Sequence, residues 1–552
     1  MIKPLLAGFM LVTAIVIYRS GRELTFHYDE WNFVLGRQGW NFNTFLVPHN
    51  EHLLLIPVAV FKVLFVTVGL DAYRPYLLVP LGLHLLCVWL VFVYVRRRRG
   101  ELVAFVASVL LLVLGAAWHA LLVPLNLSFL ASVAAGLGAL IALERHDGRG
   151  DAAACGLLAI ALASSSIGIS FAAAALVEIL WLRSRWRRVW AVALPLALYA
   201  AWFLAYGNPD AAPGAEGGAF ELARSNLPAV PGYVFNAAAA ASGGLVGLSI
   251  DWGRPLVFVG GLALAVKLLR GTPFSPRSVG LFAAAATYWG IMALFRAQLN
   301  TPADSRYLYF GGVLIILLVV ELMPAILPRR EVLVVAAVLL TGSAVSGFSL
   351  LHDGSLFLQS WSRFVRAELA ALEVAGPTTN PGYLPDPSRA PGISAGPYFA
   401  VVSDLGSPAF EAAEVERLAE PERSDADAVL IEALPVSIQP HVNGATVGPR
   451  PRIDVAQGGR VAFRPGCVTF DPTTPAARLE LTLPAWGIAL TVSETVEVRL
   501  RSFAEGFPQI PLGGVEPGPR HAIRIPFRAG RTWHLRLTPA TRLTACGLRA
   551  EA

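Results

Sequence analysis

Long apolar runs separated by short polar segments occupy residues 1–350 of the 552-residue chain. A helix needs about 17–25 predominantly apolar residues to cross a bilayer, and most of the runs approach or reach that length. The pattern therefore predicts a polytopic α-helical membrane protein surrounded by the lipid bilayer. The runs are Leu5–Tyr18, Leu53–Leu70, Tyr76–Val95, Leu102–Trp118, Leu127–Leu143, Ala152–Leu162, Ile167–Leu182, Trp190–Tyr206, Tyr233–Ile250, Pro255–Leu269, Val279–Phe295, Leu308–Leu327 and Val332–Leu350.

Clusters of arginine and lysine between the runs predict how the chain is oriented. Such clusters prefer the cytoplasmic side of a membrane. All of them fall on that side if Leu53–Leu70 and Tyr233–Ile250 are helices in or near the outer interface rather than spans. This arrangement gives about eleven spans, a cytoplasmic N-terminus and an extracytoplasmic C-terminus in the plasma (inner) membrane. The clusters are Arg96–Arg99, Arg145 with Arg149, Arg183 to Arg188, Lys267 to Arg277, and Arg329–Arg330.

The pattern changes after residue 350. Ser355–Val374 spaces its apolar residues as an amphipathic helix does, and the proline-dense segment Gly376–Pro397 predicts a linker. From 398 to 552, short segments alternate apolar and polar residues between Pro and Gly turns, which is typical of a β-sandwich. We expect a transmembrane domain at 1–350 with its first outer loop at 19–75, a linker at 351–397, and a soluble, extracytoplasmic β-rich domain at 398–552. The clearest strands are Arg478–Leu483, Val496–Leu500, Ala522–Phe527 and Thr532–Leu537.

Composition supports a membrane protein and argues against a nucleic-acid-binding one. Hydrophobic residues make up 55% of the chain and charged residues only 15%, which leaves too little polar surface for a soluble protein of this length. The formal net charge is +6, but the basic residues lie mainly in the clusters that topology already explains. No nucleic-acid partner is predicted.

Two of the four cysteines fall in the predicted β-rich domain. Cys467 and Cys546 are far apart in sequence, as are the cysteines of a disulfide that closes a small β domain in an oxidising compartment. If the domain is exported, we expect these two residues to be bonded. Cys87 and Cys155 lie in apolar runs and are expected to be inert packing residues.

The first outer loop places two adjacent carboxylates, Asp29 and Glu30, among aromatic residues just beyond the first apolar run. One interpretation is a solvated loop with no further role. The other is a functional site, because carboxylates beside a membrane surface can accept protons or bind cations. The residues alone leave both interpretations open.

A second polar segment, His49–His52, precedes the apolar run Leu53–Leu70. It can be the start of a helix, with Asn50 as the N-cap residue and Glu51 in the first turn. Alternatively, His49, Glu51 and His52 help to bind a divalent metal together with the acidic pair of the same loop. Their spacing is not a recognised ligand signature, so a metal is not assigned.

The order of these features resembles the GT-C superfamily of polyprenyl-phosphate-dependent glycosyltransferases, and within it the protein mannosyltransferase and aminoarabinose transferase type. In that type an acidic pair opens the first outer loop and an apolar juxtamembrane helix follows; Asp29-Glu30 and Leu53–Leu70 match these features. The Lys-Pro-Pro-Leu stretch common before that helix is replaced by His-Asn-Glu-His, so contacts to donor or acceptor are expected to differ. The chain also resembles a group of large actinobacterial membrane proteins with an Asp/Glu-Trp loop and the same His-Asn-Glu-His motif.

The resemblance, which covers about residues 1–350, implies a role for each matching residue. Asp29 occupies the position of the carboxylate that accepts the proton of the acceptor hydroxyl, with Glu30 as the reserve candidate. The leaving lipid phosphate needs a cation, and Arg306 beside Tyr307 enters a late span from the outer side. Arg306 can equally be an interfacial arginine beside an aromatic belt. With them, the histidines and Glu51 of the His49–His52 segment are candidate substrate-binding residues.

The implied function is a membrane glycosyltransferase of cell-envelope glycan assembly. It would move a sugar from a polyprenyl-phosphate donor to an extracytoplasmic glycan, glycolipid or protein acceptor. Two alternatives belong to other classes: a non-catalytic membrane protein that organises envelope assembly through its C-terminal domain, and a transporter. The scarcity of charged residues within the predicted spans argues against the transporter.

Overall fold

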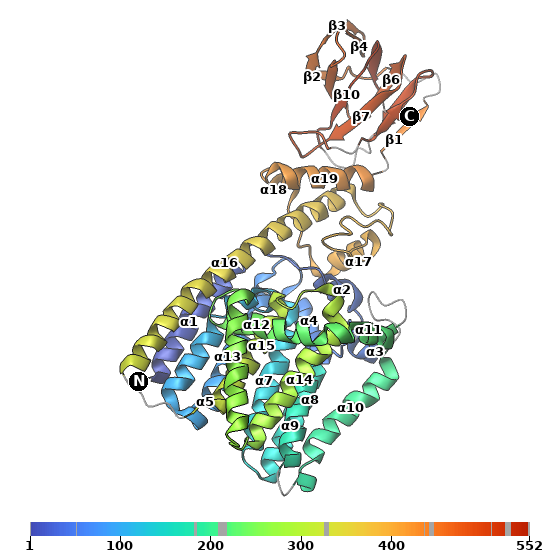
Figure 1. Cartoon of the computed structure of the whole chain (residues 1–552). Helices are drawn as coiled ribbons and strands as arrows, with labels where there is room; N and C mark the ends of the chain where they lie inside the picture. The colour runs from blue at the N-terminus through green and yellow to red at the C-terminus, as the bar shows by residue number, and fades with distance from the viewer. Residues whose placement is uncertain are drawn as a thin grey trace. The chain divides into compact units, whose positions relative to one another are not determined.

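The computed structural model describes residues 2–50, 52–181, 185–207, 218–324, 330–434, 436–440, 447–508, 511–524 and 531–549. The chain divides into two compact units (Figure 1). The membrane unit comprises Met1–Leu24, Arg37–Val68 and Ala72–Gln359. The C-terminal unit comprises Thr25–Gly36, Gly69–Asp71 and Ser360–Ala552. Part of the first outer loop therefore belongs to the C-terminal unit.

The membrane unit consists of helices joined by turns and loops in the part of the chain that the structure describes. Seven of its helices are long and apolar enough to cross a membrane, judged by length and composition, and α4, α9 and α10 are shorter apolar helices. The predicted helical class is thus confirmed, while the count of spans stays a prediction. The helices are α1 (Ile2–Ser20), α3 (Phe42–Leu46), α4 (Leu55–Val68), α5 (Leu78–Leu112), α6 (Trp118–Leu122), α7 (Leu127–Leu143), α8 (Gly148–Ser164), α9 (Ile167–Trp181), α10 (Trp190–Tyr206), α11 (Gly218–Asn226), α12 (Val230–Leu245), α13 (Ile250–Leu269), α14 (Pro276–Arg296), α15 (Ser305–Leu322) and the first part of α16 (Arg330–Ala375).

Small residues let the helices of this unit approach closely. Helix α14 packs along α9, and a Cβ added at Gly280 would lie 2.6 Å from the carbonyl oxygen of Ala174. Helix α13 packs along α12 in the same way, because a Cβ at Gly253 would lie 1.8 Å from the carbonyl oxygen of Ala239. Close backbone approach of this kind is how helices associate in lipid, where apolar side chains gain little by leaving their surroundings.

Two pairs of predicted segments share one element label, but only the second pair is a continuous helix. The runs Tyr76–Val95 and Leu102–Trp118 both contribute to α5, where two helices meet at a kink because Gly100, with φ of 82° and ψ of 179°, is not helical. The run Val332–Leu350 and the amphipathic segment Ser355–Val374 form one 46-residue helix, α16. No proline separates that second pair, and Gly354 between them lies against the ring of Trp118, which leaves no room for a Cβ. The sequence suggested a break there that the packing does not need.

Four of the five basic clusters come together at one end of the membrane unit. Arg98 pairs with Glu144 at 2.7 Å and also with Glu321, and Arg188 pairs with Asp151 at 2.7 Å. Loops that share ion pairs must lie on the same side of a membrane, which supports the predicted orientation of these clusters. A cavity of about 230 Å³ at this end is lined by Arg98, Glu144, His146, Glu178, Ser275, Pro276, Arg277 and Glu321.

The C-terminal unit combines helices with an antiparallel β-sandwich. Strands begin only at Ser437, so the predicted β-rich segment opens with helices rather than strands, and the boundaries at 350 and 397 stay predictions. Its elements are α2 (Glu30–Gly36), the end of α16, α17 (Ala395–Leu405), α18 (Ala412–Val415), α19 (Glu420–Ala433), β1 (Ser437–Pro440), β2 (Arg452–Gln457), β3 (Gly459–Arg464), β4 (Cys467–Pro472), β5 (Arg478–Thr482), β6 (Ile488–Val492), β7 (Val496–Arg501), β8 (Gly513–Val515), β9 (His521–Arg524), β10 (His534–Leu537) and β11 (Leu543–Gly547).

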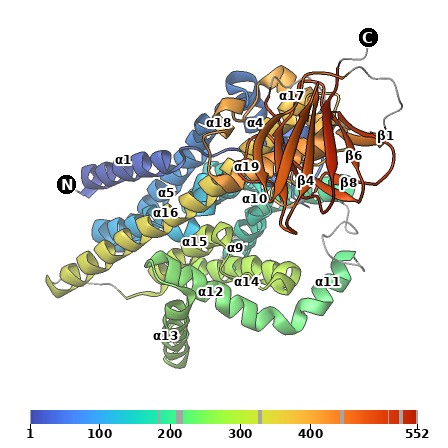
Figure 2. The same ribbon diagram turned by 90° about the horizontal axis from the view of Figure 1, so that it is seen from above.

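Two sheets form the sandwich, which is seen from two directions in Figures 1 and 2. One sheet has the order β1-β9-β6-β11-β4-β3 and the other β2-β5-β10-β7-β8. A strand lies in the described part of each of the four segments predicted from alternating residues, and apolar positions such as Leu481 and Leu535 are fully buried. Residues 525–527 of the predicted strand Ala522–Phe527 lie outside the described residues. The β-sandwich prediction is therefore confirmed. It could be made because successive side chains of a strand point to opposite faces of a sheet, so apolar and polar residues alternate along the sequence.

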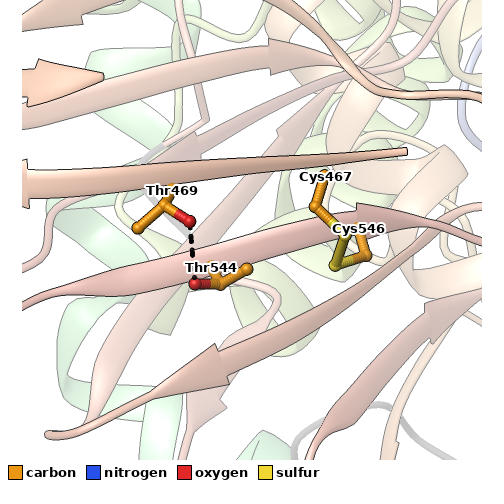
Figure 3. Close-up of a disulfide and its surroundings, with 4 residues drawn as sticks. All are labelled: Cys467, Thr469, Thr544 and Cys546. Carbon is orange, nitrogen blue, oxygen red and sulfur yellow. Dashed lines mark hydrogen bonds between the residues drawn. A yellow bond between two sulfur atoms is a disulfide. The ribbon is translucent and has the colours of Figure 1, made fainter. Parts of the chain in front are cut away.

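A disulfide joins neighbouring strands of the larger sheet. Cys467 of β4 and Cys546 of β11 stand directly opposite each other and are bonded (Figure 3). Two residues further along the same pair of strands, the hydroxyls of Thr469 and Thr544 are 3.2 Å apart. The structure thus bridges the two cysteines that the sequence singles out. Among the described residues, Cys87 and Cys155 are free thiols.

Candidate functional site

The acidic pair lies in a tight turn that opens α2. The backbone N–H of Glu30 donates to the carbonyl oxygen of His27 at 2.9 Å, and that of Trp31 donates to the carbonyl oxygen of Tyr28 at 3.2 Å. Tyr28 has φ of 43°, a left-handed conformation that costs a non-glycine residue about 1–3 kcal/mol. The turn is held by Glu30, whose Oε2 accepts a hydrogen bond from the backbone N–H of His27 at 2.8 Å.

The two carboxylates have different surroundings. The Glu30 side chain is fully buried and is used to close the turn. Asp29 is only half-buried, and its backbone oxygen accepts the N–H of Asn32 at 3.1 Å. Glu30 therefore supports the turn, and Asp29 is the more exposed of the two residues.

Aromatic side chains from distant parts of the sequence fix this turn within the C-terminal unit. Trp31 is buried and donates its indole N–H to the carbonyl oxygen of Phe26 at 3.0 Å. Its ring lies 6.2 Å from that of Tyr398 in α17, and the ring of His27 lies 5.2 Å from that of Trp361 in α16. Such contacts restrict the backbone around the acidic pair.

The structural role of Glu30 can be tested with two substitutions. Glu30→Gln keeps a side-chain oxygen that can accept the His27 N–H, whereas Glu30→Ala removes the acceptor. We expect Glu30→Ala to destabilise the C-terminal unit by about 1–3 kcal/mol, the cost of a buried donor without a partner. Glu30→Gln should cost less. Thermal unfolding of the purified full-length protein measures both, and an alanine variant as stable as wild type would contradict the assignment.

In the membrane unit, the His49–His52 segment forms a turn of its own. The backbone N–H of each histidine donates to the carbonyl oxygen of the other, at 3.1 and 3.0 Å, and Asn50 has φ of 45°. Helix α4 begins only at Leu55, with Pro57 in its first turn, where a missing N–H is tolerated. The expectation that Asn50 is a helix N-cap is therefore wrong.

Two buried cations that the sequence analysis did not single out organise this part of the loop. Arg37 donates to the carbonyl oxygens of Thr44, Val47 and Pro48 at 2.8, 2.9 and 3.0 Å. Lys62 of α4 is 2% exposed and donates to the carbonyl oxygen of Arg37 at 2.7 Å. Lys62 could have been found from the sequence, because burying a charged lysine within an apolar run costs free energy unless the ammonium group has partners.

The environment of the two histidines keeps them neutral. Burial, together with the charge of Arg37, lowers the pKa of His49 to about 4. Burial, then the charge of Arg296, then His49, lowers the pKa of His52 to about 4. Both rings are therefore uncharged near neutral pH and can donate or accept hydrogen bonds or bind a metal, but do not act as cations.

This shift predicts how stability depends on pH. A histidine whose pKa is lower in the folded state than its ordinary 6.5 binds fewer protons when folded. The contribution of such a histidine to the free energy of unfolding is therefore complete above pH 6.5 and is lost as the pH falls toward about 4. We expect His49→Gln/His52→Gln to lose less thermal stability than wild type between those pH values. Equal losses in the two proteins would contradict the shift.

Arg306 is held by the residue that starts its helix. Asp304 caps α15 by accepting the backbone N–H of Arg306 at 3.1 Å, and its other oxygen accepts the guanidinium at 2.9 and 3.0 Å. The guanidinium lies 5.2 Å from the ring of Tyr307, whose carbonyl oxygen accepts the hydroxyl of Tyr288 at 2.9 Å. A donor phosphate at Arg306 would therefore have to share this cation with Asp304.

The predicted site residues are divided between the two units. Asp29 and Glu30 belong to the C-terminal unit, and the membrane unit holds the others: His49, His52, Arg306 and Tyr307. Glu51 lies outside the described residues. Within the described ranges, no group of three or more His, Cys, Asp or Glu could hold a metal ion. The roles in donor and acceptor binding stay predictions.

Solved structures that are similar to this chain include two forms of one protein. No family model and no curated protein matches the chain. ArnT from Cupriavidus metallidurans bound to undecaprenyl phosphate is 15% identical over 68% of this chain and 81% of that chain, with a TM-score of 0.42. Its apo form is 15% identical over 70% and 81%, with a TM-score of 0.44. ArnT is a GT-C aminoarabinose transferase, the type that the sequence resembles. Both TM-scores are below 0.5, so the case for a function rests on the chain's own residues.

Proposed function

We propose that this protein is a membrane glycosyltransferase that moves a sugar from a polyprenyl-phosphate donor to an extracytoplasmic acceptor. The observation that carries the proposal is the acidic turn after α1, in which Glu30 is buried as a support and Asp29 is the more exposed of the two residues. A first span, an acidic pair, the apolar helix α4 and the long helix α5 then follow in the order of the transferase type that the sequence resembles.

The proposed reaction is a displacement at the anomeric carbon of the donor sugar. The acceptor hydroxyl attacks that carbon and forms the new glycosidic bond, while the bond from the carbon to the phosphate oxygen breaks. The polyprenyl phosphate leaves with the bonding electron pair, and Asp29 accepts the hydroxyl proton. Arg306, and the neutral His49 and His52, are the proposed groups for donor and acceptor contacts.

The two alternative functions make different demands on the same residues. A transporter usually carries ionisable groups along a path within its spans. Glu178 and Glu321, two carboxylates within the predicted spans, are in ion pairs with Arg277 and Arg98 at the end where the basic clusters meet. That placement disfavours the transporter. A non-catalytic organiser of envelope assembly would bind envelope polymers and transfer no sugar.

Wild-type membranes offered labelled hexosyl and pentosyl polyprenyl phosphates test the proposal. Undecaprenyl phosphate, which is bound in one of the similar structures, is the first lipid carrier to use. Transfer of label to an envelope glycan, glycolipid or protein supports the transferase. A protein that is folded and membrane-inserted but transfers no sugar from the whole panel would move the organiser ahead.

The proposed topology gives a separate prediction. If the four meeting basic clusters are cytoplasmic, a reporter fused after the C-terminal unit should be active only as an exported protein. Paired fusions of a reporter that works only outside the cytoplasm and one that works only inside measure this directly. A fusion after residue 99, in the first basic cluster, is the matched control and should show the opposite behaviour. Cytoplasmic activity of the C-terminal fusion would overturn the orientation.

A further inference from the structure

The outer face of the smaller sheet carries an unusual arrangement of charges. Strands β5, β10 and β7 bury their apolar residues, such as Leu479, Leu537 and Leu500, in the sandwich. The alternate positions form cross-strand rows on the opposite face. One row consists of Thr482, His534 and Arg501. The next row, two residues along the same strands, consists of Glu480, Arg536 and Arg499. The polar face therefore has a defined register.

Like charges stand directly opposite each other between β10 and β7. Arg536 stands directly opposite Arg499. Directly opposed like charges destabilise an antiparallel pair of strands. Ion pairs with Glu480 and Glu497 offset part of this repulsion, and a bound anion would offset more of it.

The loop after β7 holds these arginines in place. The guanidinium groups of Arg536 and Arg501 lie 4.2 and 5.0 Å from the ring centre of Phe507. Arg499 donates to the carbonyl oxygen of Pro508 at 3.3 Å. A planar guanidinium that is already oriented loses less freedom when it pairs with a carboxylate or phosphate. The cluster is therefore organised before any ligand arrives.

Neighbouring carboxylates only partly balance the positive charge. Glu480 pairs with Arg536 at 3.0 Å and with Arg478 at 3.3 Å, and Glu497 pairs with Arg499 at 2.5 Å. Four arginines and two carboxylates leave a surplus of two positive charges on this part of the sheet. The side chains of Arg499 and Arg536 are 31% and 26% exposed, so a ligand can reach them.

We propose that this arginine face, formed by Arg478, Arg499, Arg501 and Arg536, binds a carboxylate-bearing glycan. The planar fork of arginine matches a carboxylate with two parallel hydrogen bonds, and several arginines on adjacent strands suit a chain with repeated carboxylates. The choice of a glycan rests on the proposed function, since the acceptor of an envelope glycosyltransferase is then an envelope polymer. The β-sandwich would hold that polymer while its end is extended.

Binding is measured on the full-length protein in nanodiscs of zwitterionic lipid, separately from any transfer assay. The probe is an oligogalacturonate, and its methyl ester is the matched neutral ligand with the same sugar backbone. We expect the acid form to bind at least about tenfold more tightly than the ester, with binding that weakens as salt is added. Equal binding of the two forms would overturn the proposal.

Variants locate the site. Arg499→Gln/Arg536→Gln should weaken oligogalacturonate binding about tenfold or more. Arg460→Gln/Arg464→Gln, on exposed β3 of the other sheet, makes the same change in charge and should bind as wild type does. Arg499→Lys/Arg536→Lys keeps the charge but removes the fork, and should give a smaller loss. Thermal unfolding confirms that each variant is folded.

Every outcome decides between specific alternatives. Equal losses in the two glutamine variants would mean general charge attraction and would overturn the site. Binding to vesicles of anionic lipid but not to oligogalacturonate would replace the glycan by a lipid surface. A protein that binds oligogalacturonate but transfers no sugar would keep this site while the proposed transferase fails. Transfer to an acidic glycan that the arginine face does not bind would support the transferase and overturn the binding site.

Discussion

Asp29→Asn is expected to lower sugar transfer by about 10²–10⁴-fold and to leave the fold intact. Asparagine has the size of aspartate and keeps one side-chain oxygen, but it cannot accept the proton of the attacking hydroxyl. The backbone hydrogen bonds that close the turn and the bond accepted by Glu30 are unchanged by this substitution. Transfer of labelled sugar by membranes with matched amounts of each protein gives the measurement.

Two matched substitutions make this result specific. Glu30→Gln tests the residue that supports the turn and should reduce transfer less than Asp29→Asn does. Asp404→Asn removes an exposed carboxylate of α17 in the same unit and should leave transfer unchanged. Asp29→Asn transfer close to wild type would remove Asp29 from the mechanism. A loss of similar size in Asp404→Asn would point to a general effect of charge.

Removal of the disulfide is expected to have the largest effect on stability. Cys467 and Cys546 are 79 residues apart in sequence, so their bond restricts most of the sandwich in the unfolded chain. Cys467→Ser/Cys546→Ser should lower the free energy of unfolding by about 2–5 kcal/mol. Thermal unfolding with and without reductant measures this loss, and mass spectrometry of unreduced peptides detects the bond itself.

The response to reductant distinguishes the bond from ordinary packing. Wild type should melt lower after reduction, whereas the double serine variant should not respond. Cys155→Ser removes a free thiol and should keep the wild-type response. Two free thiols in the exported, folded protein would contradict the pairing and, with it, the oxidising compartment assigned to the C-terminal unit.

Sequence periodicity was sufficient for much of the fold. Apolar runs long enough to cross a bilayer became helices, and segments such as Arg478–Leu483 became strands, because burial imposes the repeat of each element on its residues. Continuity was harder to predict. The single helix α16 places Gly354 against Trp118, a residue far away in sequence that local periodicity does not reveal. The helices α17–α19, which precede the sandwich, were not predicted from the sequence either.

The candidate site was predictable as a list of residues but not as a set of roles. Asp29 and Glu30 look equivalent in sequence. The structure distinguishes them, because the backbone N–H of His27 donates to the buried Glu30, while Asp29 is more exposed. The turn at Asn50 depends on paired backbone groups of His49 and His52, which have no sequence signature. Arg37 was missed because its partners are carbonyl oxygens, which any residue supplies.

The most direct test of the central claim is the stoichiometry of a single transfer by the purified protein in nanodiscs. A labelled polyprenyl-phosphate sugar and an acceptor are mixed with wild type or with Asp29→Asn, and both free polyprenyl phosphate and glycosylated acceptor are counted. The account predicts equal amounts of the two products from wild type, and donor that stays intact with Asp29→Asn. Release of polyprenyl phosphate without glycosylated acceptor, or equal product from both proteins, would contradict it.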